Sequence, residues 1–210
     1  MDKAKVAEFE SLLLATKRPG IEKLLEFVRK SDFYTAPAST RFHSCHEGGL
    51  LEHSLNVYHC LMQKKNDPVW ADILNEVGDE SLAIASLLHD LCKAMYYVVE
   101  FKNKKVYSEN GKKSDSNGRF DWQSVPGYTV DDKIPLGHGE KSCFMIEEFM
   151  RLKPVERYMI RWHMLFSEPK DQYNTLGAAL KRYPVILAIS EADLESTYLR
   201  EKGTSEVNKR

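Results

Sequence analysis

The chain has 210 residues, of which 42% are hydrophobic and 29% charged, and its formal net charge is -1. This length and balance fit one globular domain with a sizeable core. The near-neutral charge argues against a surface built for long nucleic acid or an acidic membrane. No apolar run reaches the roughly 18 residues of a membrane span, and the amino terminus lacks the apolar stretch of a signal peptide. Four scattered cysteines without a Cys-x-x-Cys pair lead us to expect reduced thiols in a cytoplasmic protein.

The first third of the chain is predicted to be helical. Apolar periodicity indicates a helical hairpin over residues 1–36, followed by a loop up to residue 47. A helix of about 50–65 then places His53 on an apolar stripe with Leu50 and Val57. A histidine on such a stripe is either a hydrogen-bonded core residue or a ligand. This helix alone leaves both interpretations open.

The next predicted helix, residues 80–93, is apolar on nearly every side, which is typical of a buried helix. Its last turns contain His89 and Asp90. A buried carboxylate is costly unless it is paired, hydrogen-bonded or bound to a metal, so this dipeptide needs partners. A capped polar pair near a helix end would also satisfy the pattern.

Residues 95–135 change the pattern from helical to extended. Residues 95–101 are rich in β-branched and aromatic side chains, 103–105 favour a turn, and 109–118 have the composition of a mobile loop. Further short strands are predicted up to residue 130. We therefore expect a mainly α fold with a small β insertion over 95–135. Its aromatic residues either hold the small sheet together or stack on a base.

The remaining chain is again predicted to be helical, and three more polar residues lie on its apolar faces. His138 belongs to a helix ending near Leu152, His163 follows the apolar side of the next helix, and Asp193 lies on the stripe of a strongly apolar last helix. Residues 201–210 are polar and are expected to form a flexible tail. No linker divides the chain, so residues 1–210 are expected to form a single domain.

Four histidines and two aspartates thus lie on apolar faces or at helix starts of different elements: His53, His89, Asp90, His138, His163 and Asp193. Together they suggest a shared centre. Imidazoles and carboxylates without thiolates suit a catalytic metal better than a structural zinc. Helical bundles build such centres from side chains on facing helices.

Five stretches resemble the motifs of the HD-domain metal-dependent phosphohydrolases, over about residues 40–196: GGLLEHS (48–54), LLHDLCK (87–93), LGHGEKS (136–142), IRWHM (160–164) and AISEAD (188–193). The His-Asp dipeptide alone is weak evidence, and the ordered set carries the resemblance. It implies a helical HD-type bundle with a first divalent metal on His53, His89, Asp90 and Asp193. It also implies a second metal on His138 and His163, with Asp90 bridging the two. Mn, Fe, Co, Ni or Zn would all accept such ligands.

Several positions near these motifs have open roles. Cys92 stands where many relatives have glycine, and whether its thiol approaches the metals is open. Lys93 lies three residues after Asp90 and could neutralise a phosphoryl oxygen. His43, Arg41 and Lys141 are candidate substrate contacts, although solvated basic side chains would also explain the last two. Adjacent helix residues point roughly 100° apart, so spacing alone does not predict that His89 and Asp90 share a metal.

The resemblance implies hydrolysis of a phosphate ester or anhydride of a nucleotide or short oligonucleotide. Related 3′-to-5′ exoribonucleases share the Gly-Gly-Leu-Leu-Glu-His motif but carry an additional OB-type module. Only about 40 residues precede the motif here, and the near-neutral charge lacks the grip that long polyanions require. A non-catalytic nucleotide-binding module and a helical interaction domain are the alternatives from other classes. The sequence does not indicate an oligomeric state.

Overall fold

The computed structural model describes residues 1–40 and 44–201, which form a mainly α fold with one small β insertion, as predicted. The α-helices of this part are α1 (Lys3–Ala15), α2 (Ile21–Lys30), α3 (Gly49–Gln63), α4 (Ala71–Val77), α5 (Asp79–Leu88), α6 (His138–Glu147), α7 (Pro154–Trp162), α8 (Tyr173–Arg182) and α9 (Val185–Glu195). Single 3₁₀ turns occupy Lys64–Asn66, Leu91–Lys93, Leu165–Ser167 and Lys170–Gln172, and a π-helical turn, Ser196–Arg200, follows α9. None of these helices is long and apolar enough to cross a membrane.

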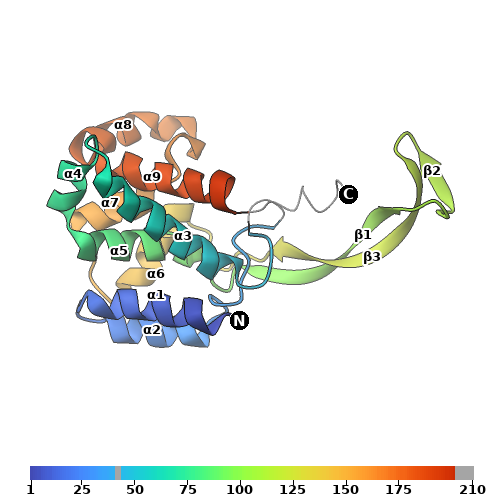
Figure 1. Cartoon of the computed structure of the whole chain (residues 1–210), viewed down its shortest axis with the longest axis horizontal. Coiled ribbons are helices and arrows are strands. Elements are labelled where there is room, and N and C mark those ends of the chain that lie inside the picture. The colour runs from blue at the N-terminus through green and yellow to red at the C-terminus, as the bar shows by residue number, and fades with distance from the viewer. Residues whose placement is uncertain (41–43, 202–210) are drawn as a thin grey trace.

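Helix α5 lies at the centre of the helical body. It packs against α3 and α7, and α9 packs against these same two helices. Residues 81–88 of α5 are all buried, which is why the helix tolerates no polar face. Helices α1 and α2 form the predicted hairpin, with α1 lying against α3 and α5 (Figure 1).

The helix predicted over residues 80–93 is shorter than expected and ends at Leu88. Asp90 has φ −105° and ψ 20°, between the helical and extended regions, and Leu91–Lys93 forms a 3₁₀ turn. Local propensity favours a continuous helix here because the residues are good helix formers. The contacts that Asp90 makes with other elements, described below, outweigh this preference.

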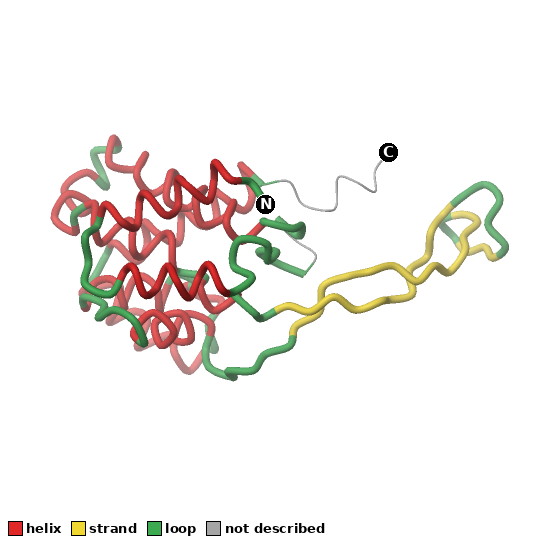
Figure 2. The backbone as a smooth tube through the Cα atoms, turned by 90° about the horizontal axis from the view of Figure 1, so that it is seen from below, coloured by secondary structure: helices red, strands yellow, loops and turns green. Residues whose placement is uncertain are grey.

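The β insertion is an arm and not a layer of the body. Strands β1 (Tyr97–Tyr107) and β3 (Gly118–Val130) pair antiparallel along their length, and the short β2 (Lys113–Asp115) pairs with β3 near the tip. The ribbon projects far from the helices in two perpendicular views (Figures 1 and 2). No strand packs extensively on a helix of the described part.

The strands are longer than the sequence predicts. The turn expected at residues 103–105 is absent, because Asn103, Lys104 and Lys105 pair with β3 and continue β1. Strand β2 also lies inside the stretch predicted as a mobile loop, residues 109–118. Cross-strand pairing is a long-range contact, so it can override local turn composition.

Candidate metal centre

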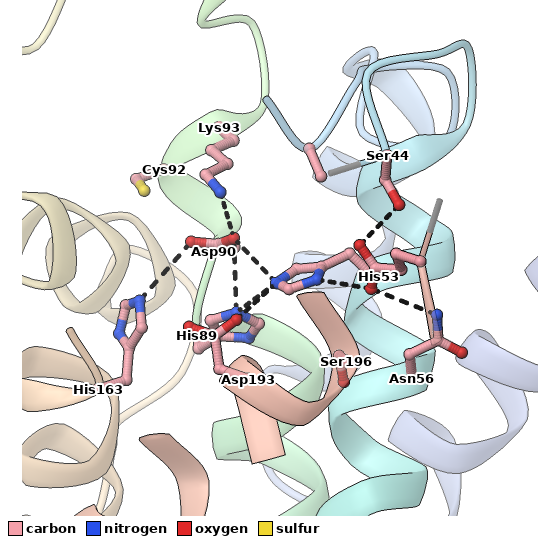
Figure 3. Close-up of polar contacts among 12 residues, drawn as sticks. Ser44, His53, Asn56, His89, Asp90, Cys92, Lys93, His163, Asp193 and Ser196 are labelled. Atoms are coloured by element: carbon pink, nitrogen blue, oxygen red, sulfur yellow. Dashed lines mark hydrogen bonds and ion pairs between the residues drawn. The ribbon is translucent and has the colours of Figure 1, made fainter. Parts of the chain in front are cut away.

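The six residues predicted to share a centre come from the ends or middle of five helical elements. They are His53 in α3, His89 and Asp90 just after α5, His138 at the first residue of α6, His163 directly after α7, and Asp193 in α9. Figure 3 shows five of them, all except His138, converging on one point. The fold therefore brings together all six residues from positions up to 140 residues apart in the chain (from 53 to 193).

One group of donors surrounds the Nε2 atom of His53. This atom lies 3.3 Å from His89 Nε2, 3.2 Å from Asp193 Oδ1 and 3.6 Å from Asp90 Oδ2. Ligand atoms of His53, His89 and Asp90 lie within 4.8 Å of one another, so one cation could be reached by all three. The cluster is compatible with an HD-type site.

The break after α5 explains how adjacent residues reach one centre. His89 Nδ1 donates to the carbonyl of Ser86 at 2.8 Å, which turns its Nε2 toward His53. Asp90 has left the helical conformation, so its carboxylate can also face inward. The roughly 100° separation of neighbours in a regular helix does not apply at this position.

A second group of donors faces the other oxygen of Asp90. His138 Nε2 donates to Asp90 Oδ1 at 2.7 Å, and His163 Nε2 lies 3.8 Å from that oxygen. The other oxygen, Oδ2, faces His53 and accepts a hydrogen bond from Lys93 Nζ at 2.6 Å. Asp90 thus lies at the junction of the two groups.

His163 has a buried ring nitrogen with no hydrogen-bond partner among the described residues. Its Nδ1 donates to the carbonyl of Ile160 at 2.7 Å, but its Nε2 has no such partner. Burial, together with His89 and His138, lowers the pKa of His163 to about 3, so the ring is neutral. A neutral imidazole with an unused lone pair is the form that binds a metal.

The carboxylate of Asp90 stays ionised although it is buried. Burial alone would raise its pKa, but Lys93, His89 and His138 hold the pKa well below its ordinary value. Asp90 in turn raises the pKa of Lys93 against the effect of burial. The centre therefore offers a charged carboxylate and a charged ammonium.

Glu201 is a neighbour of the centre that the sequence did not predict. Its buried carboxylate accepts hydrogen bonds from His53 Nδ1 at 2.9 Å, Ser44 Oγ at 2.7 Å and Asn56 Nδ2 at 3.3 Å. Burial disfavours a charged imidazole, yet Asp193 and Glu201 raise the pKa of His53 to about 10. The predicted flexible tail is therefore wrong at its first residue. No local periodicity marks Glu201, since the segment around it is polar.

Two predicted substrate contacts, Arg41 and His43, lie outside the described residues. The third, Lys141, is buried and forms an ion pair with Asp132, and its ammonium lies 4.7 Å from the centroid of the Tyr96 ring. The positive charge of Lys141 is thus already matched by a carboxylate.

The thiol of Cys92 lies near the centre. Its Sγ atom lies 3.3 Å from His138 Nδ1, and Asp90, Cys92 and His138 form a further group of donor atoms that could hold a metal. The thiol therefore lies beside the second group. The centre meets solvent at this end, since the side chain of His138 is 32% exposed.

Comparisons with protein-family models, with curated proteins and with solved structures each find no match. A function for this chain is therefore inferred from the geometry and chemistry of the centre.

Proposed function

We propose that this chain is a metal-dependent phosphohydrolase of the HD type, acting on a nucleotide or short oligonucleotide. The observation that carries the proposal is the convergence of four imidazoles and two carboxylates on one buried centre. Their order along the chain is the order of the HD motifs. Chance placement of core histidines does not account for six donors that face one another.

The donor set fits a pair of divalent cations. His53, His89, Asp90 and Asp193 would hold one, and His138, His163 and Asp90 the other. The unpartnered Nε2 of His163 supports this assignment, because a buried polar atom without a partner is rare in proteins. A divalent cation bound here would act as a Lewis acid on a phosphoryl oxygen and would make water more acidic at neutral pH.

Lys93 is the residue proposed to contact the phosphoryl group. Its ammonium lies 2.6 Å from Asp90 Oδ2 and stays protonated because Asp90 raises its pKa. A positive charge fixed in a buried centre stabilises negative charge that develops on a phosphoryl oxygen. Asp90 orients this ammonium and the imidazole of His138 from its two oxygens. The substrate would enter beside His138, where the centre meets solvent.

The preference for a small substrate rests on charge. The net charge is -1, and the charge of the buried Lys141 is matched by Asp132. A long polyanion requires rows of lysines and arginines that are available to phosphates. Of the proposed substrate contacts, Lys141 would have to open its ion pair before it could bind phosphate, whereas Arg41 and His43 remain candidates.

The test starts with elemental analysis of protein purified without chelator. We expect bound Mn, Fe, Co, Ni or Zn, and hydrolysis of members of a panel of mononucleotides, cyclic dinucleotides and short RNA with added Mn²⁺. Asp90→Ala should lose both metal and activity, whereas Asp131→Ala, at a surface carboxylate, should keep them. Full metal content and full activity in Asp90→Ala would refute the mechanism.

Two other outcomes would replace the proposal. Turnover of long RNA alone would indicate an exoribonuclease. Nucleotide binding without turnover by the metal-loaded protein would indicate a non-catalytic nucleotide-binding module.

A further inference from the structure

The arm formed by β1, β2 and β3 has one apolar face. Residues paired across an antiparallel ribbon lie on the same side, and side chains alternate between the two sides along each strand. One side therefore gathers nine apolar or aromatic residues, which we call the arm face: Tyr97, Val99, Phe101, Tyr107, Phe120, Trp122, Pro126, Tyr128 and Val130. The opposite side carries five charged residues: Glu100, Lys102, Lys104, Arg119 and Asp121.

Much of the arm face is exposed. Val99, Phe101, Tyr107, Trp122 and Val130 are 60%, 73%, 45%, 50% and 46% exposed. Phe120 alone is buried, since it packs against Tyr107 and Trp122 at the tip. A two-stranded ribbon without a second layer is only marginally stable in water. An apolar face along a ribbon that no described helix covers thus indicates a missing partner.

The charge of the arm face argues against an anionic partner. Two cations lie on the same side near the tip: Lys105, which is held by Asp115 at 2.6 Å, and Lys113, which pairs with Phe120. Phosphates of a nucleic acid or of lipid head groups would therefore meet cations only near the tip, and an apolar surface along the rest of this side. The chemistry fits an apolar surface of similar length and twist.

The arm of a second copy of this chain offers an apolar surface of the same length and twist. We propose that the arm face packs against the same face of a second copy of this chain, forming a two-layer β structure around a twofold axis. Two sheets of equal twist pack face to face at about 10 Å, so identical ribbons follow one another along their length. Such an interface uses one patch twice, which is the commonest arrangement in soluble oligomers.

The exposed area of the arm face is sufficient for a specific interface between two arms. With roughly 150–250 Å² for each aromatic side chain, the exposed parts of Phe101, Tyr107 and Trp122, together with those of Val99 and Val130, sum to about 500 Å² on each arm. Two arms would bury about 1,000 Å², the lower bound for a specific interface. Pairing through the ribbon edges is less favourable, because Pro126 lacks an N–H and Lys102 and Lys104 place charges there. This dimer does not depend on the proposed phosphohydrolase activity.

The test measures the mass of the full-length protein by sedimentation equilibrium across about 1–100 μM. We expect a dimer for the wild-type chain and at least a tenfold weaker association for Phe101→Asp. Val98→Asp is the matched control, because Val98 is exposed on the opposite side of the same strand. A wild-type monomer at the highest concentration, or equal effects of both substitutions, would overturn the proposal.

A cross-linking experiment covers the case in which Phe101→Asp unfolds the arm. Ser124 lies in the middle of the apolar side and its neighbour Gln123 on the other side. Ser124→Cys should form a disulfide between two copies under mild oxidation, and Gln123→Cys should not. Cross-linking of both or of neither variant would contradict face-to-face packing. A monomer that binds single-stranded RNA through Phe101 would instead assign the face to nucleic acid.

Discussion

Replacing Glu201 tests whether the carboxylate that binds His53 Nδ1 increases the metal affinity of the centre. The carboxylate accepts the Nδ1 proton of His53 at 2.9 Å, which leaves Nε2 facing His89 and Asp193. A carboxylate in this position fixes the ring and increases the basicity of the ligating nitrogen. We therefore expect weaker metal binding when Glu201 is changed. The loss should be larger when the new side chain removes both the charge and the hydrogen-bond acceptor than when it removes the charge alone.

The expected loss of metal affinity follows from the hydrogen bonds that Glu201 accepts. Glu201→Gln keeps an acceptor for His53 but removes the charge, so we expect about tenfold weaker binding. Glu201→Ala also leaves the buried donors of Ser44 and Asn56 without their acceptor, and we expect up to about a hundredfold loss. These losses correspond to about 1.4 and 2.8 kcal/mol.

The assay is isothermal titration of the metal-free protein with Mn²⁺, with thermal melting of the metal-free variants alongside. Glu195→Gln is the control, since Glu195 is a carboxylate of the same C-terminal region that pairs with Lys64 and not with the centre. Wild-type affinity in a folded Glu201→Ala variant would refute the reasoning. Equal losses in Glu201→Gln and Glu195→Gln would show a general charge effect instead.

Three further changes have defined outcomes. His163→Ala should lower the metal content from about two ions per chain to about one, measured by elemental analysis, because only the second group loses a ligand; unchanged stoichiometry would contradict the two-group assignment. Glu10→Gln should lower the free energy of unfolding by about 1 kcal/mol near pH 7, because Arg29 and Tyr34 bind the carboxylate and hold its pKa below the ordinary 4.5. This difference should shrink as the pH falls through the lowered pKa of Glu10. Denaturant titrations near pH 7 and below that pKa measure it, and an unchanged difference would contradict the reasoning. Leu87→Ala, in the buried stretch 81–88 of α5, should lower the free energy of unfolding in urea by about 2–5 kcal/mol, whereas Leu187→Ala at an exposed position should lower it far less.

Part of the fold could be predicted from the sequence because the residue patterns that indicate it are local. The period of apolar residues predicted the helices that carry His53 and Asp193 and the helix that ends just before His163, and the β-formers located the insertion. The polar residues of the centre were recognisable because each one interrupts an apolar face. That interruption depends only on neighbours three or four residues away.

The sequence by itself thus determined the helical class, the place of the β insertion and the six residues of the candidate centre. Only the tertiary structure decided that α5 ends before His89, that the insertion extends as an arm, and that Glu201 lies behind His53. These features depend on contacts between distant segments, and the His53–Glu201 hydrogen bond joins residues 148 positions apart. Local propensity carries no information about such contacts, so it predicted a continuous helix at Asp90 and a flexible tail at Glu201.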